Sequence, residues 1–190
     1  MASINSRLDQ IIPKIKEDKF IQGRGLGNEI SFYIFDYDPE DELIVRDYIK
    51  HIKKEFSNEI LNRRIIEFDL YKMMLDFAKE MGVFEHIFMK EEKEGREELF
   101  RAMEHFTQTD IFLEKIKEDL GNHNVIFITG VGKVYPFVRS HNILNNLLEK
   151  IDTTPLIMFF PGVYDGLSLK LFGKIKDDNY YRAFRLIDRK

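Results

Sequence analysis

Residues 125–133, VIFITGVGK, join a run of four apolar residues to a turn that contains two glycines. A mixed apolar and polar segment follows at 134–147, and a second apolar run at 155–160 ends in Pro161-Gly162. Short apolar runs bounded by Gly or Pro are typical of buried strands, and the segment between them is typical of an amphipathic helix. Strand, helix and strand in this order predict a βαβ unit.

In open parallel sheets, ligands bind where loops leave the carboxyl ends of the strands. The turns at 130–136 and 161–166 directly follow the two predicted strands. A site for a small molecule or an anion is therefore expected at these two turns.

The rest of the chain continues the same alternation. Further strands are predicted at 30–35 and 64–68, and a last one at 180–187, with helical patterns between them. This order predicts an α/β fold with a mostly parallel sheet of about five strands flanked by helices. A P-loop-NTPase-like topology is compatible with it, without a functional P-loop.

We expect a single α/β domain over residues 1–190, helix-rich in 1–121 and sheet-rich in 122–190. Asp38-Pro39 is typical of a helix start, since Asp is a good cap and Pro fits the first helical position. The helix that follows should bury one apolar stripe, made of Ile44, Tyr48, Ile52 and Phe56. The charged run KEEKEGREE at 90–98 is typical of a solvated loop or a helix entry.

The composition excludes several classes of protein. Of the 190 residues, 44% are hydrophobic and 33% charged, and no apolar run is long enough for a membrane span or placed like a signal peptide. Because the chain has no cysteine, it has no disulfide and no thiolate site. A formal net charge of −4 argues against a general nucleic-acid binder. We expect a cytoplasmic protein without membrane contact, and no motif requires a cofactor or a metal.

Five stretches carry a more specific signal. They are TGVGKVYPFVRSHNILNNL (129–147), FFPGVYDG (159–166), LKLFGKIKDDNYYRAFRLI (169–187), LGNEISFYIFDYDPEDEL (26–43) and IIEFDLYKMML (65–75). Together they span nearly the whole chain and resemble the BrxB family. Members of that family are small components of bacterial BREX systems, which defend against phage, and they sit beside a large ATPase, a DNA methyltransferase and a PglZ-type protein.

The resemblance implies a role in phage defence and supplies no catalytic residues. What it implies is a non-catalytic assembly or adaptor subunit that binds another BREX protein. The PglZ-type protein is the first candidate partner, followed by the ATPase or the methyltransferase. Contact with DNA is then expected only through the complex.

Gly130, Gly132 and Lys133 look like part of a P-loop, but the motif is incomplete. Phe127 stands where the first glycine should be, and Val134 replaces the hydroxyl residue that would hold magnesium. Magnesium-dependent ATP hydrolysis is therefore not expected. An anion-binding corner at these three residues stays open, as does ordinary packing of a βα turn.

Asp36 and Asp38 leave an enzymatic alternative open. Haloacid-dehalogenase-type phosphatases place a nucleophilic Asp and an acid/base Asp at this spacing after a strand. In those enzymes the last acidic pair follows a strand, whereas Asp177-Asp178 precede the last predicted strand. The alternative is thus a degenerate phosphohydrolase, and Asp38 is equally well explained as a helix cap.

The C-terminal segment is rich in aromatic, aliphatic and basic residues. From Leu169 onward, seven basic residues stand against three acidic ones. Interface cores favour Tyr, Phe and Arg, with other charges at the rim. The predicted partner-binding face consists of Arg139, His141, Tyr164, Phe172, Tyr180, Tyr181, Arg182 and Arg185. Alternating aromatic and basic residues at 180–185 also leave a DNA-contacting subunit open.

Overall fold

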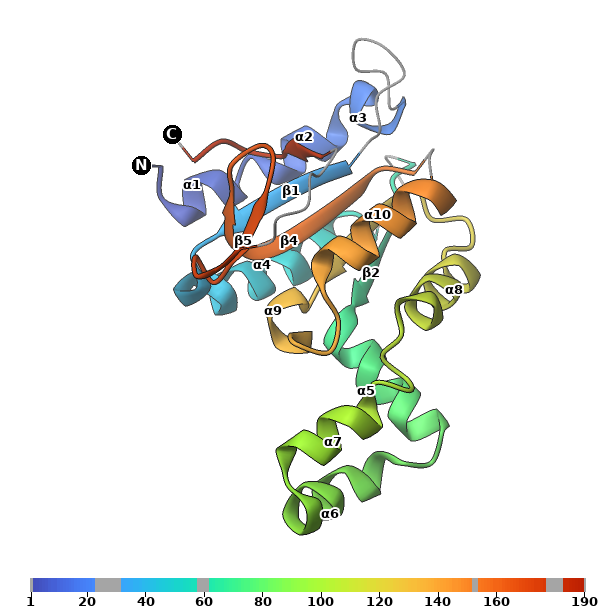
Figure 1. Cartoon of the computed structure of the whole chain (residues 1–190). Coiled ribbons are helices and arrows are strands. Elements are labelled where there is room, and N and C mark those ends of the chain that lie inside the picture. The colour runs from blue at the N-terminus through green and yellow to red at the C-terminus, as the bar shows by residue number, and fades with distance from the viewer. Residues whose placement is uncertain (1, 23–31, 58–61, 152–153, 177–182, 190) are drawn as a thin grey trace.

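The computed structural model describes residues 2–22, 32–57, 62–151, 154–176 and 183–189 (Figure 1). Its centre is a parallel sheet with the strand order β2-β3-β4-β1-β7. The strands are β1 (Phe32–Tyr37), β2 (Ile65–Asp69), β3 (Val125–Thr129), β4 (Leu156–Tyr164) and β7 (Phe184–Arg185). The predicted α/β fold with a mostly parallel sheet is confirmed.

The first strand of the chain lies inside the sheet. β1 pairs with β4 from Phe32 opposite Leu156 to Tyr37 opposite Pro161, and its other edge pairs with the short strand β7. β3 and β4 are parallel neighbours, so the βαβ unit predicted from the sequence is present. Of the predicted last strand at 180–187, residues 180–182 lie outside the described part of the chain.

Helices cover both faces of the sheet because successive strand side chains point to opposite faces. Phe35, Phe127 and Phe159 belong to one buried cluster, and Ile34, Ile128 and Met158 belong to the other. The first cluster is covered by α1 (Ile4–Leu8), α2 (Ile11–Lys16), α3 (Asp18–Gln22) and α4 (Glu42–Glu55). The second is covered by α5 (Leu70–Glu80), α8 (Thr109–Asp119), α9 (Val131–Val134) and α10 (Ser140–Lys150).

β4 continues beyond the point where the sequence places its end. After Pro161 it leaves β1 and pairs antiparallel with β5 (Leu169–Leu171), which in turn pairs with β6 (Ile175–Lys176). Pro161 and Gly162 therefore mark a change of partner, and the prediction that the strand ends there is wrong. This antiparallel extension, absent from the sequence-based expectation, lies next to the carboxyl ends of the central strands.

The buried stripe of α4 differs from the predicted one. The short 3-10 helix η1 (Pro39–Asp41) precedes α4, whose buried residues are Val45, Ile49 and Ile52, while Ile44 is 44% exposed. Of the predicted stripe, Ile52 and Phe56 are buried and Tyr48 packs against the same cluster, so the prediction is wrong only at Ile44. Residues spaced strictly by four drift about 40° around a helix at each step, which takes Ile44 off the buried face. The observed spacing of four and then three keeps its residues on the same side.

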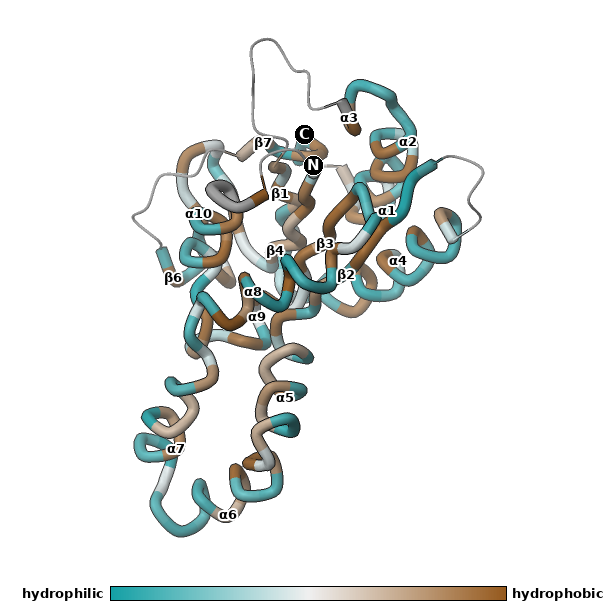
Figure 2. The backbone as a smooth tube through the Cα atoms, turned by 90° about the vertical axis from the view of Figure 1, so that its right-hand side faces the viewer, coloured by the Kyte–Doolittle hydropathy of each residue, from teal (hydrophilic) through white to brown (hydrophobic). Residues whose placement is uncertain are grey.

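Two further helices project away from the sheet. α6 (Phe84–Glu94) and α7 (Arg96–Met103) are joined at Gly95 and lie beyond the end of α5, far from the strands (Figures 1 and 2). The charged run at 90–98 is thus mostly helical, and the loop interpretation is wrong. An ion pair between Lys90 and Glu94, four residues apart at 2.6 Å, is of the kind that stabilises helices. We refer to residues 84–103 as the arm.

Across the described ranges, none of the helices combines the length and the apolar character that crossing a bilayer requires.

Candidate functional site

The carboxylate of Asp36 is completely buried at the carboxyl end of β1. Its Oδ2 accepts hydrogen bonds from Nε of Arg189 at 2.8 Å and from the backbone N–H of Tyr164 at 3.1 Å. Its Oδ1 accepts from Nη2 of Arg7 at 3.3 Å, and Nε of Arg185 lies 3.9 Å from the same oxygen. We call these five residues the Asp36 cluster.

The bend of β4 brings Tyr164 to Asp36. A Cβ at Gly162 would lie 2.3 Å from the carbonyl oxygen of Lys170, so only glycine allows β4 and β5 to approach this closely. Tyr164 itself is fully buried, and its hydroxyl donates to the carbonyl oxygen of Ala183 at 2.7 Å. Tyr164 is therefore a core residue, and its prediction as part of a partner-binding face is corrected.

The arginines of the cluster also bind backbone carbonyl oxygens. Arg7 donates to the carbonyl oxygens of Ile187 and Asp188, and Arg185 donates to that of Tyr164. Burial lowers the pKa of the Arg7 guanidinium; Asp36 opposes this effect, and the neighbouring arginines add to it. Since arginine stays protonated in proteins, the buried carboxylate serves to hold these cations together.

The geometry does not suit Asp36 as a phosphatase nucleophile. A nucleophile needs an open path to one of its oxygens, whereas both oxygens of Asp36 are buried and accept hydrogen bonds. Asp38 pairs with Arg189 at 2.9 Å and makes no side-chain cap, so that part of the helix-start prediction is wrong. A small cavity of about 150 Å³ lies beside Arg7, Asp38 and Arg189.

Lys133, in the predicted anion corner, is paired with an acidic residue. Its Nζ lies 2.5 Å from Oδ2 of Asp69, whose other oxygen accepts the backbone N–H groups of Tyr71 and Lys72 at the start of α5. Gly130 has a φ of +73°, and a Cβ there would lie 2.1 Å from Asp69. These contacts favour ordinary packing of a βα turn. Gly132 likewise leaves room for the ring of Phe172.

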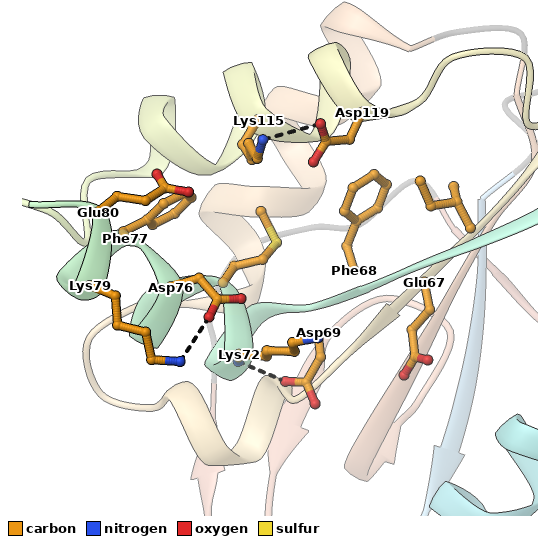
Figure 3. A pocket seen from close by; sticks show the side chains of 12 residues that line it. Glu67, Phe68, Asp69, Lys72, Asp76, Phe77, Lys79, Glu80, Lys115 and Asp119 are labelled. Atoms are coloured by element: carbon orange, nitrogen blue, oxygen red, sulfur yellow. Dashed lines mark hydrogen bonds and ion pairs between the residues drawn. The ribbon is translucent and has the colours of Figure 1, made fainter. Parts of the chain in front are cut away.

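A larger cavity of about 440 Å³ lies between β2, α5 and α8 (Figure 3). Phe68 and Phe77 lie in its wall, and Lys79 and Lys115 are paired with Asp76 and Asp119 at its rim, each pair at 3.1 Å. No local sequence motif marks this cavity, because three separate elements build it. Among the described residues, no group of three His, Asp or Glu could hold a metal ion.

The predicted partner-binding residues that the structure describes do not form one surface. Arg139 is exposed before α10 and His141 is half-buried within it, whereas Phe172 packs over Gly132 and Arg185 belongs to the Asp36 cluster. Tyr180, Tyr181 and Arg182 lie outside the described residues. The exposed apolar residues of this segment are others, namely Val163, Leu167, Ile175 and Phe184. Val163, Leu167 and Ile175 lie on or beside the β4–β5–β6 extension, which the sequence alone did not predict, whereas Phe184 lies in β7.

Comparisons with known proteins identify the chain. The sequence model described as "BREX protein BrxB" matches residues 66–186. A Bacillus cereus protein of the same name (strain H3081.97) is 47% identical over 193 aligned positions, covering 100% of both chains. A BREX protein BrxB of Escherichia coli O9:H4 (strain HS) is 37% identical, covering 95% of this chain and 90% of its own. No solved structure matches. The chain therefore belongs to the BrxB family.

Proposed function

We propose that this protein is a non-catalytic assembly subunit of a BREX phage-defence complex, and that it binds another BREX protein directly. Membership of the BrxB family supports a role in the BREX system. The PglZ-type protein is the first candidate partner, then the ATPase or the methyltransferase. Contact with DNA would then be made through the complex.

One observation carries the proposal of a direct partner. Nine large hydrophobic side chains are exposed among the described residues, and four of them fall between Val163 and Phe184. Single exposed apolar residues are normal, whereas apolar side chains that lie together on the surface mark interaction sites. On the antiparallel extension, Val163 lies opposite the exposed Lys170, and Leu167, 60% exposed, lies in the adjoining turn. We call these three residues the hairpin face.

The hairpin face has the composition of a small interface, with two apolar side chains and one charged side chain. Its two apolar side chains would form the buried centre, and Lys170 would lie at the rim. The buried side chains behind it, Tyr164 and Leu169, hold the extension in place and would not touch the partner. A rigid support of this kind limits the entropy lost on binding.

The test is co-purification from cells that carry a complete BREX system. Tagged wild-type protein should recover the PglZ-type protein, and the double variant Val163→Asp/Leu167→Asp should recover about tenfold less or lower still, as expected for hot-spot residues. The matched control is Leu43→Asp/Ile44→Asp, which makes the same chemical change on exposed α4 and should recover normal amounts.

Two results would count against the proposal. Wild-type protein that recovers no other BREX protein would reject a role in assembly. Turnover of a phosphate ester by the purified protein, lost in Asp38→Asn, would contradict the non-catalytic assignment. Normal recovery by the folded hairpin variant would move the interface elsewhere on the protein.

A further inference from the structure

The helix α6 in the arm buries very little of its own surface. α6 has 11 residues and none of them is buried. Isolated helices shorter than about 12–15 residues are marginal in water, so α6 depends on its neighbours. Phe84 and Ile87 supply this support by packing against the core cluster on one side. The opposite side of α6 has no such contact among the described residues.

The apolar surface of α6 is wider than the part that packs. At 100° per residue, Ile87, Phe84, Phe88 and Met89 fall within an arc of about 200°. Glu91 lies between Ile87 and Phe84 on this arc, and Glu92 and Glu85 lie between Phe88 and Met89. Only the half with Ile87 and Phe84 faces the core, whereas Phe88 is 64% exposed and Met89 46% exposed. Met81, just before α6, is also exposed. We call Met81, Phe88 and Met89 the arm face.

Charges around the arm face are mainly acidic. Residues 84–103 contain six glutamates and four basic residues. Three of the four basic side chains are paired with glutamates of the arm itself: Lys90 with Glu94, Arg96 with Glu91, and Arg101 with Glu98. Glu85, Glu92 and Glu97 are exposed and make no ion pair with any described residue. The charge left for an external partner is therefore negative.

We propose that the arm is a second docking element, which inserts Phe88 and Met89 into an apolar groove rimmed by Lys and Arg on another protein. An amphipathic helix that lays its apolar face into a groove is a recurrent mode of recognition. Complementary charge at the rim favours a basic partner over an acidic one. The proposal rests on the assembly role argued above and adds a second contact, because the arm and the β5 extension lie at different ends of the molecule (Figure 1).

Site-specific crosslinking in the full-length protein tests which molecule covers the arm face. A photoreactive p-benzoylphenylalanine replaces Phe88 in cells that carry the complete BREX system. Irradiation should join the protein to one BREX component, identified by mass spectrometry. The same group placed at Leu43, which is exposed on α4, should give no such product. A crosslink only between two copies of this chain, or none at all, would overturn the proposal.

Charge reversal tests the chemistry of the partner. Phe88→Asp should reduce recovery of the crosslinked component about 30-fold, as a central hot spot does. Glu92→Lys/Glu97→Lys should reduce it about tenfold at low ionic strength, with a smaller loss at high salt. The matched control, Glu114→Lys/Glu118→Lys, changes the charge equally on exposed positions of α8 and should bind normally.

These outcomes separate the arm from the hairpin face. If both folded arm variants recover normal amounts of the BREX component and the hairpin variant does not, the assembly role stands and the arm is rejected as a docking element. Stronger binding after the Glu92→Lys/Glu97→Lys change would show an acidic partner and equally reject the proposal. Far-UV circular dichroism and unfolding curves confirm that each variant is folded.

Discussion

Arg189 donates a hydrogen bond of 2.8 Å to the buried carboxylate of Asp36, which lies 153 positions earlier in the chain. Asp36 also accepts from Arg7 in α1, so a single side chain of the central strand holds segments near both ends of the described chain. A contact of this kind contributes to the stability of the whole fold, and its importance is measurable.

Replacing Asp36 by Asn should destabilise the protein by about 3–5 kcal/mol, because it leaves buried arginines without their counter-charge. For a chain of this length the loss corresponds to a fall in Tm of about 10 °C. Urea unfolding monitored by circular dichroism measures it. Asp38→Asn is the control, since Asp38 is exposed and its pair with Arg189 should contribute about 1 kcal/mol or less. Equal effects of the two changes would contradict the role given to Asp36.

Gly130→Ala should destabilise the protein by at least about 2 kcal/mol for two reasons. Alanine is strained in the left-handed conformation of Gly130, and the displaced Asp69 would no longer cap the start of α5. The added Cβ would collide with Asp69, which holds both Lys133 and the start of α5. Gly82→Ala separates the two causes, because Gly82 has a similar φ of +68° and nothing within 4 Å. Its cost should stay at about 1 kcal/mol, the cost of placing an L-residue in the left-handed conformation. The free energy of unfolding of both variants decides the matter.

The stability of the protein should fall in alkaline solution. Burial raises the pKa of the Tyr37 phenol above its usual value of 10.0, and the carboxylate of Glu42, which accepts its hydrogen bond at 2.6 Å, raises it further. The unfolded chain then loses this proton first, so stability is complete below pH about 10 and decreases above it, by up to about 1.4 kcal/mol per pH unit. Urea unfolding between neutral and alkaline pH measures this slope.

The same experiment on Tyr37→Phe supplies the control. This variant should be less stable at neutral pH, having lost a hydrogen bond, but its stability should fall less steeply above pH about 10. Burial also raises the pKa values of Tyr33 and Tyr48, so a shallower decline should persist. Identical slopes in the two proteins would exclude Tyr37 as the cause.

Amide hydrogen exchange should be much faster in α6 than in β3. All five residues of β3 are buried, whereas α6 buries none, and segments with few buried contacts open with low free energy. Exchange measured by mass spectrometry on the isolated protein tests this difference. If the arm docks as proposed, adding its partner should slow exchange in α6. Equal protection of α6 and β3 in the isolated protein would contradict the prediction.

The parallel sheet was predictable because its strands are buried on both faces. Such strands appear in sequence as continuous apolar runs, and 125–128 and 155–160 are of this kind. The start of α5 was predictable for a different reason. The Asp69 side chain accepts hydrogen bonds from the backbone N–H groups of Tyr71 and Lys72, so the cap involves only residues close together in sequence.

The Asp36 cluster could not be predicted from local pattern. Asp36 was singled out with Asp38 for their spacing after a strand, but the partners of Asp36 lie 29 and 153 positions away. No sequence motif marks Arg7, which lies in a short helix near the start of the chain. Similarly, the aromatic, aliphatic and basic composition of the C-terminal segment predicts Tyr164 in a partner-binding face, whereas its side chain is buried. Only the change of strand partner after Pro161 buries its side chain.

The position of β1 between β4 and β7 also sets limits on shortened versions of the protein. A fragment cut to residues 66–186, the part matched by the family, would lack β1 together with α1 to α4. β4 would then present an open edge in the middle of the former sheet, and β7 would have no neighbour, an arrangement prone to aggregation. We therefore expect soluble expression to need β1 and α1 to α4, and partner binding is better mapped with point substitutions than with truncations.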